Sequence, residues 1–186
     1  MAKVDKREWK LPIFEGLCPT AIDWAMMAAY LDGEGSVLIN PRRSRVGSGD
    51  GMFQDIASTF YLKITVANTD PRLVAWCKAK FGGTFKDANS RAYYVGRNIK
   101  IAWHWSASST RAAWILYNCM PYFVIKDEQA NIGIQLQESM TLSGGWRRLP
   151  KEVIEARREL KRQLLVMKAK GRDLEPAEQA RINEVA

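Results

Sequence analysis

The 186-residue sequence has little histidine, little cysteine and no long hydrophobic run. His104 stands alone, which excludes zinc sites and nuclease sites that need two or more histidines. Cys18, Cys77 and Cys119 are widely spaced and form no Cys-x-x-Cys pair, so a zinc or redox motif is excluded and a reducing compartment is favoured. Any bound metal must therefore be held by carboxylates and carbonyl oxygens.

The sequence also lacks a membrane segment. No apolar run approaches the roughly 20 residues of a membrane span, and the first residues lack the apolar core of a signal peptide. We therefore expect an intracellular protein, in a cytoplasm or an organelle, with no membrane partner. Hydrophobic residues make up 47% and charged residues 26%, so the chain resembles an ordinary globular protein with one core.

Acidic residues are too few to balance the basic ones, and the net charge is +8. Most of the excess lies between residues 147 and 172, which contain 10 Lys and Arg against 3 Asp and Glu. A basic surface attracts a polyanion by releasing its condensed counterions. Charge alone leaves two interpretations open, a nucleic-acid-binding protein and a basic protein with solvated lysines.

The pattern predicts an α+β fold. Thr20 and Asp23 have capping-box spacing before a helix over 21–31, and Asp70-Pro71 and Gly82-Gly83 bound a helix over 71–81. Further helices are predicted from Ser108 or Ser109 to before Pro121 and over 127–140. Alternation predicts strands over 36–39, 59–66, 84–86 and 93–105, which form one antiparallel four-stranded sheet with helices on one face.

The chain divides into three predicted parts: an N-terminal arm over 1–19, a main domain over 20–145 and a basic helical extension over 146–186. In the extension, Pro150 opens a helix that ends at Gly171, with an apolar stripe and charged outer faces. The tryptophans Trp76, Trp103 and Trp105 fall on apolar faces, so we assign them to the core.

The segment from Met27 to Gly35 carries the most specific signal. Ala25, Ala28 and Ala29 follow helical spacing and predict a small-residue stripe against which a second helix can pack closely. Asp32-Gly33-Glu34-Gly35 then turns from helix to strand and leaves a carboxylate at the negative end of the helix dipole, where a cation is favoured. Taken alone, the tetrapeptide is also compatible with a simple acidic turn.

Met27-Ala28-Ala29-Tyr30-Leu31-Asp32-Gly33-Glu34-Gly35, followed by Ser36 and a strand, resembles the motif that names the LAGLIDADG family of homing endonucleases. Pro121-Tyr122-Phe123-Val124-Ile125-Lys126 with Gln129-Ala130-Asn131 is similar to the family's segment that leads to a catalytic lysine. The resemblance covers roughly residues 20–140 and implies a LAGLIDADG-type αββαββα arrangement whose sheet binds DNA. One departure is Ala29, which stands where the motif has glycine, so we expect paired helices to lie slightly farther apart.

The resemblance implies a role for each matching residue. Glu34 binds Mg²⁺, for which Mn²⁺ substitutes, and the carbonyl of Gly33 assists. Lys126 stabilises charge or organises water at the scissile phosphate. Asn68 takes a polar catalytic position at the end of the second strand, where relatives often have glutamine, and Asp32 hydrogen-bonds across the helix pair.

Because only one motif occurs, the resemblance implies a homodimer, built on Ala25, Ala28, Ala29 and Asp32, that cuts both strands of a near-palindromic DNA site. The sheet face away from the helices is expected to contact the DNA. Alternation selects as contacts the residues Asn40, Arg42, Ser44, Thr59, Tyr61, Lys63, Thr65, Lys86, Arg91, Arg97 and Lys100. Two alternatives remain: a group I intron maturase that binds intron RNA, and a DNA-binding protein of this fold that does not cleave.

Overall fold

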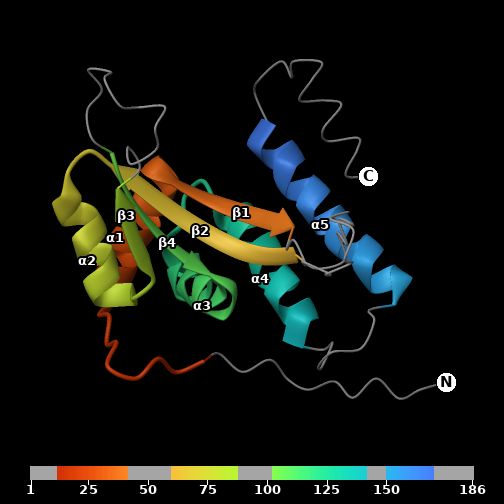
Figure 1. The fold of residues 1–186 in the computed structure, drawn as a ribbon, viewed down its shortest axis with the longest axis horizontal. Helices are drawn as coiled ribbons and strands as arrows, with labels where there is room; N and C mark the ends of the chain where they lie inside the picture. Colours follow the sequence, from red (N-terminus) through yellow and green to blue (C-terminus); the bar gives the residue numbers. More distant parts are fainter. Residues whose placement is uncertain (1–11, 42–59, 88–101, 142–149, 170–186) are drawn as a thin grey trace, which may run out of the picture.

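The computed structural model describes residues 12–41, 60–87, 102–141 and 150–169. Its centre is a four-stranded antiparallel sheet in the order β1-β2-β4-β3 (Figure 1). The strands are β1 (Gly35–Pro41), β2 (Phe60–Asn68), β3 (Thr84–Asp87) and β4 (Trp103–Ser108). The sheet confirms the predicted α+β class.

Helices pack against one face of this sheet (Figure 1). They are α1 (Ala21–Glu34), α2 (Pro71–Phe81), α3 (Ser109–Cys119), the short 3₁₀ helix η2 (Met120–Tyr122) and α4 (Asp127–Thr141). A last helix, α5 (Lys151–Ala169), lies beside the outer strand β1 and contacts α4. Within the described residues, no helix is both long and apolar enough to cross a membrane.

Two predicted helix starts are confirmed by their hydrogen bonds. The Thr20 hydroxyl accepts from the Asp23 amide at 3.2 Å, and the Asp23 carboxylate accepts from the Thr20 amide at 2.8 Å. At α2, the Asp70 side chain accepts from the Arg72 amide at 2.9 Å. Each cap satisfies amide groups that have no partner inside the first helical turn.

Two predicted boundaries were wrong. The first helix continues through Asp32 and Gly33 to Glu34, so the acidic tetrapeptide contains the last turn of α1 and not a separate turn after it. Strand β4 continues beyond Trp105 to Ser108, which stands at the N-cap of α3 without a side-chain capping bond. The earlier part of that predicted strand, before residue 102, lies outside the described residues.

Burial alternates strictly along β2, because every second side chain faces the core and those between face the opposite side of the sheet. Leu62, Ile64 and Val66 are fully buried, whereas the residues between them are half-buried. Trp105 of β4 is also fully buried, and its indole nitrogen donates to the Gly82 carbonyl at 2.7 Å. The prediction that the tryptophans of β4 face the core is confirmed for this residue.

Helix α5 is part of the same core. Leu164 is 2% exposed and belongs to the main hydrophobic cluster, and Leu160 and Met167 pack against that cluster. Arg157 is also buried and donates to the Ser139 carbonyl at 2.7 Å and to the Ser139 hydroxyl at 3.0 Å. Because α4 ends at Thr141, these bonds fasten α5 to the last turn of α4.

Candidate active site and nucleic-acid interface

The junction between α1 and β1 requires glycine at position 35. A Cβ atom on Gly35 would lie 2.6 Å from Leu31 Cα and 2.8 Å from the Leu31 carbonyl oxygen, so any other residue would displace the helix. The backbone at the start of β1 therefore passes directly against Leu31 of α1. As a result, Glu34 is held at the end of α1 with its side chain exposed.

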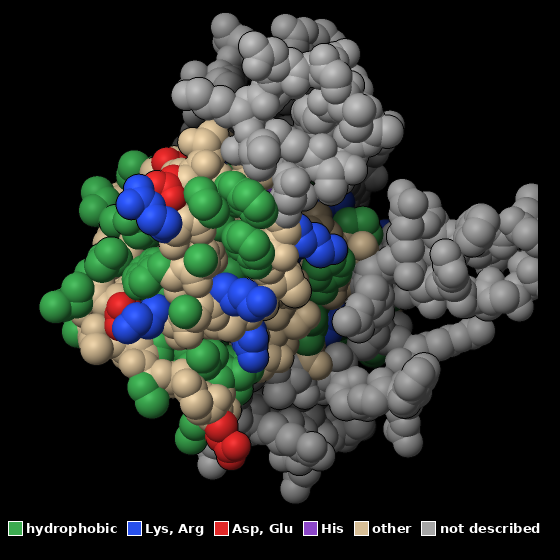
Figure 2. All heavy atoms as spheres, turned by 60° about the vertical axis from the view of Figure 1, so that its left-hand side comes forward, with side chains coloured by type: hydrophobic (Ala, Val, Ile, Leu, Met, Phe, Trp, Pro, Cys, Tyr) green, Lys and Arg blue, Asp and Glu red, His purple; other side chains and the backbone are tan. Residues whose placement is uncertain are grey.

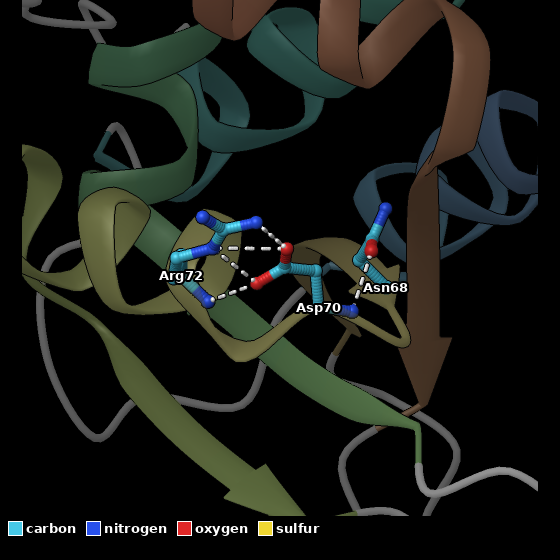
Figure 3. A network of polar contacts seen from close by, with 3 residues as sticks. All are labelled: Asn68, Asp70 and Arg72. Atoms are coloured by element: carbon cyan, nitrogen blue, oxygen red, sulfur yellow. Dashed lines mark hydrogen bonds and ion pairs between the residues drawn. The ribbon is translucent and has the colours of Figure 1, made fainter.

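Asn68, the last residue of β2, contacts Glu34 directly. Its amide nitrogen donates to Glu34 Oε2 at 2.6 Å, while its amide oxygen accepts from the Asp70 backbone at 2.7 Å (Figure 3). The second bond fixes which end of the amide faces Glu34. The two residues predicted from the motif and from strand alternation are therefore neighbours.

Arg72 lies beside this pair and was missed by the sequence analysis. Its guanidinium binds both carboxylate oxygens of Asp70, and its side chain is 89% exposed (Figure 3). The Arg72 hydrogen bonds hold the pKa of Asp70 at about 2. The capping signal of Asp70 was the available clue, because an N-cap side chain lies close to the first residues of its helix, and Arg72 is one of them.

An open hollow of about 310 Å³ lies next to Glu34. Asn68 lines it on one side, and Ala67, Thr69 and Ala102 complete the lining. The small side chains around the carboxylate leave space for a larger group, such as a hydrated ion or a phosphate.

Lys126 lies at the C-terminal end of α1. Its ammonium group donates to the carbonyl oxygens of Leu31 at 2.5 Å and of Asp32 at 2.6 Å. A cation at a helix C-terminus satisfies carbonyls and opposes the dipole. Burial lowers the pKa of Lys126, and the attraction of the Asp32 carboxylate acts in the opposite direction.

Asp32 makes its hydrogen bonds within this chain. Its carboxylate accepts from the Val124 amide at 2.8 Å and from the Lys126 amide at 2.9 Å. These bonds fasten the segment before α4 to the last turn of α1. The expected bond of Asp32 across a helix pair stays a prediction, since both of these bonds lie within one chain.

The outer surface of α1 differs from the predicted alanine stripe. Ala28 is fully buried in the chain's own core, so it cannot line a helix interface as predicted. The exposed side is formed instead by Ile22 at 72%, Met26 at 40% and Ala29, with Ala25 partly exposed beside them. It ends at Gly33, where an added Cβ would meet no atom within 4 Å.

Figure 2 brings the side of the molecule that carries α1 and α2 toward the reader. Apolar side chains cover much of this face, Lys and Arg side chains lie between them, and acidic side chains lie nearer its rim (Figure 2). In the segment that Asp32 binds, Val124 is 86% and Ile125 is 67% exposed. Large apolar exposure of this kind is typical of a surface that another molecule covers.

The sheet face away from the helices carries polar side chains in register. Thr65 of β2 pairs with Ser36 on one side and with Ser106 on the other, and Ser106 pairs with Thr84. The Thr84 and Ser106 hydroxyls lie 2.9 Å apart. Four hydroxyl groups thus form one row across the sheet.

Five residues of the predicted DNA surface follow the same parity: Asn40, Tyr61, Lys63, Thr65 and Lys86. Six others, Arg42, Ser44, Thr59, Arg91, Arg97 and Lys100, lie outside the described residues. The register adds His104, which is exposed and pairs with Lys86. His104 and three members of the hydroxyl row, Ser36, Thr84 and Ser106, were not among the predicted contacts, whereas the fourth member, Thr65, was.

The donor atoms at Glu34 suit a hard divalent cation, which prefers carboxylate and carbonyl oxygen. Among the described residues, no three His, Cys, Asp or Glu side chains gather to hold a metal. The exposed Glu34 carboxylate is an oxygen donor of this kind. In the part of the chain that the structure describes, it is not joined by two further such side chains.

No family model and no curated relative matches the sequence. Solved structures of homing endonucleases do match the fold. I-CvuI in complex with its target in the presence of Ca has a TM-score of 0.58 at 15% identity, over 89% of this chain and 95% of that one. I-CvuI with an I-CreI target in the presence of Mg, with DNA not cleaved, has a TM-score of 0.58 at 16% identity, over 88% and 92%.

The archaeal intron-encoded homing endonuclease I-Vdi141I, complexed with DNA, has a TM-score of 0.60 at 10% identity, over 88% of this chain and 96% of that one. The matches span nearly the whole length of both chains, so they include the sheet and the helices around it. Together with the sheet order and the position of the motif at the end of α1, they show that this chain has the fold of the LAGLIDADG homing endonucleases.

Proposed function

We propose that the protein is a divalent-metal-dependent endonuclease that cuts both strands of a near-palindromic DNA site as a homodimer. The observation that carries the proposal is the last turn of α1, where the Glu34 carboxylate accepts from the Asn68 amide and the Lys126 ammonium donates to the carbonyls of Leu31 and Asp32. An anion at this end of a helix is unfavourable unless a cation compensates it.

The homodimer rests on the exposed side of α1. Ile22, Met26 and Ala29 form an apolar strip with small residues at its end, so a second copy can approach closely there. Two-fold pairing would bring two Glu34 carboxylates near each other. Divalent ions bound at this place would offset the repulsion between the two carboxylates.

Each residue has a proposed part in phosphodiester cleavage. A bound Mg²⁺ or Mn²⁺ supplies an activated water and stabilises charge on the leaving oxygen. Glu34 and the Gly33 carbonyl would hold the ion, and Asn68 orients the Glu34 carboxylate by its hydrogen bond. Lys126 and the exposed Arg72 stabilise negative charge at the phosphate.

The polar sheet face is the proposed DNA surface. Lys63 and Lys86 supply charge for phosphates, and the hydroxyls of Thr65 and Ser106 supply donors and acceptors for base edges. Recognition of a DNA sequence needs donors and acceptors at fixed spacing, and the strand register would supply that spacing.

The direct test is selection of cleaved sites from a randomised duplex library, with Mg²⁺, with Ca²⁺ and with chelator. We expect cleavage in Mg²⁺ only, at sites whose two halves are related by an inverted repeat. Cleavage that survives chelation would contradict the metal role, and an asymmetric consensus would contradict the homodimer. Binding to duplex DNA without cleavage in any metal would identify a non-cleaving DNA-binding protein, and preference for structured intron RNA would identify a maturase.

A further inference from the structure

His104 is the one histidine of the sequence, and it lies on the polar face of the sheet. It is exposed in β4 and lies directly opposite Lys86 of the neighbouring strand β3, which is exposed as well (Figure 1). The Cβ atoms of such a cross-strand pair are about 5 Å apart. The two strands therefore present an imidazole and an ammonium group side by side.

The other neighbours of His104 on this face have short side chains. Ala67 of β2 is its cross-strand partner on the side away from Lys86. Ser106 lies two positions farther along β4 and belongs to the hydroxyl row. Because alternate residues of a strand share a face, these side chains lie beside the imidazole, and neither extends as far from the sheet. His104 is thus placed to reach farther into a groove of DNA than the surface next to it.

His104 also lies close to the proposed site of cleavage. Its partner Ala67 lines the hollow next to Glu34, and so does Ala102, two residues before His104 in the chain. His104 therefore stands on the part of the sheet face that borders this hollow. A base pair that it contacts would lie near the phosphate that is cut.

The chemistry of the pair favours one base. In the major groove guanine presents two acceptors, N7 and O6, whereas adenine presents the acceptor N7 and a donor amino group. An imidazole N–H group can donate to either acceptor of guanine. The positive charge of Lys86 disfavours the adenine amino donor at the same place, even while its ammonium contacts a neighbouring phosphate.

We propose that His104 is a specificity-determining residue, which donates to a guanine in the major groove at one base pair of each half-site near the cut. Lys86 supports this preference by its charge. The inference rests on the proposed function, and it names the base that this part of the sheet selects.

The test is selection of bound sites from a randomised duplex library in Ca²⁺, with the full chain and its variants, followed by sequencing. His104→Ala should reduce the preference for guanine at one position of each half-site about tenfold, a usual effect of losing one base contact. His104→Gln should move the preference from guanine to adenine at that position, because a glutamine amide matches adenine N6 and N7. The other positions should stay as in the parent.

Ser108→Ala is the matched control, because Ser108 is an exposed residue of the same strand and face, four positions from His104. Four strand residues span about 13 Å, or about four base-pair steps of 3.4 Å, so any change that the control causes should fall at another position. Relaxation of the same guanine by Ser108→Ala would overturn the inference.

Two other outcomes separate this inference from the proposed function. If the parent selects a consensus and His104→Ala leaves it unchanged, or changes a position that holds no guanine, the role of His104 is overturned and the proposed function stands. If the parent retains no duplex DNA from the library, the proposed function itself fails.

Discussion

At the N-terminal end of α1, Thr20 and Asp23 satisfy each other, and Lys80 pairs with Asp23 at 3.2 Å. At the other end of the same helix, the Glu34 carboxylate is exposed and its one described partner is the Asn68 amide. The first end shows how a helix is stabilised when its polar groups find partners inside the chain. The second keeps an exposed anion where the helix dipole disfavours it, as expected of a site that receives a ligand.

This contrast gives different expectations for substitutions at the two ends. Changes at the last turn should affect cleavage more than stability, and changes at the first turn should do the reverse. Substitutions of Glu34, Lys126 and Thr20 test that division, and a substitution of Met26 tests the exposed side of α1 between the two ends.

Glu34→Gln should reduce cleavage by about 1,000-fold, because it removes the charge that holds the metal while keeping the size of the side chain. Binding to the selected site in Ca²⁺-free buffer should persist or tighten, since a negative group near the phosphates is lost. The assays are cutting of the selected duplex and a binding titration. Full activity in the variant would remove Glu34 from the active site.

Lys126→Met should slow cleavage by about 100-fold and also lower the thermal midpoint. The second effect arises because the Lys126 ammonium satisfies the carbonyls of Leu31 and Asp32. Lys126→Arg serves as the control, since it keeps a cation at the helix end. A variant with an unchanged rate and a lower midpoint would show that this lysine has a structural role alone.

Met26→Asp should weaken self-association roughly 30-fold, because two-fold symmetry would place the introduced charges against each other in an apolar interface. Sedimentation velocity over a concentration series measures this effect, and circular dichroism checks the fold. Tyr117→Asp, which places the same charge at a half-exposed hydrophobic position on α3, is the control. Equal self-association of parent and Met26→Asp would move the interface away from α1.

Thr20→Ala should lower the free energy of unfolding by about 1 kcal/mol, the usual cost of losing a helix N-cap. Cleavage at a temperature well below the midpoint should be unchanged, since the site lies at the opposite end of the helix. Urea unfolding and the cutting assay provide the two readouts. A large loss of activity without loss of stability would break the proposed division between the two ends.

Local patterns predicted the elements well, because their signals are complete within a few residues. The Thr20 and Asp70 caps and the alternation of β2 each depend on neighbours in sequence. Alternation also led to Asn68, since a strand's parity continues to its last residue. The helix end was misplaced because Gly33 is read as a helix stop, whereas here the helix continues and only Gly35 contacts Leu31 too closely to carry a side chain.

The parts that sequence missed depend on three-dimensional neighbours. Ala28 and Ala29 share a small size and adjoining helical positions, yet the first is fully buried and the second is exposed. Helical spacing alone does not show which residues of a small-residue stripe face the core. Arg72 was missed for a similar reason, since only the fold shows that its guanidinium binds Asp70, whose backbone in turn contacts Asn68.

The attachment of α5 has a consequence for how the chain folds as it is synthesised. Residues of α5 pack against β1, more than a hundred positions earlier in the chain, and Arg157 satisfies a carbonyl at the end of α4. Until α5 leaves the ribosome, the outer strand β1 therefore lacks the side chains that pack against it in the folded protein. Closing such a distant contact is entropically costly and slow, so the edge strand is expected to be the last part of the sheet to become protected.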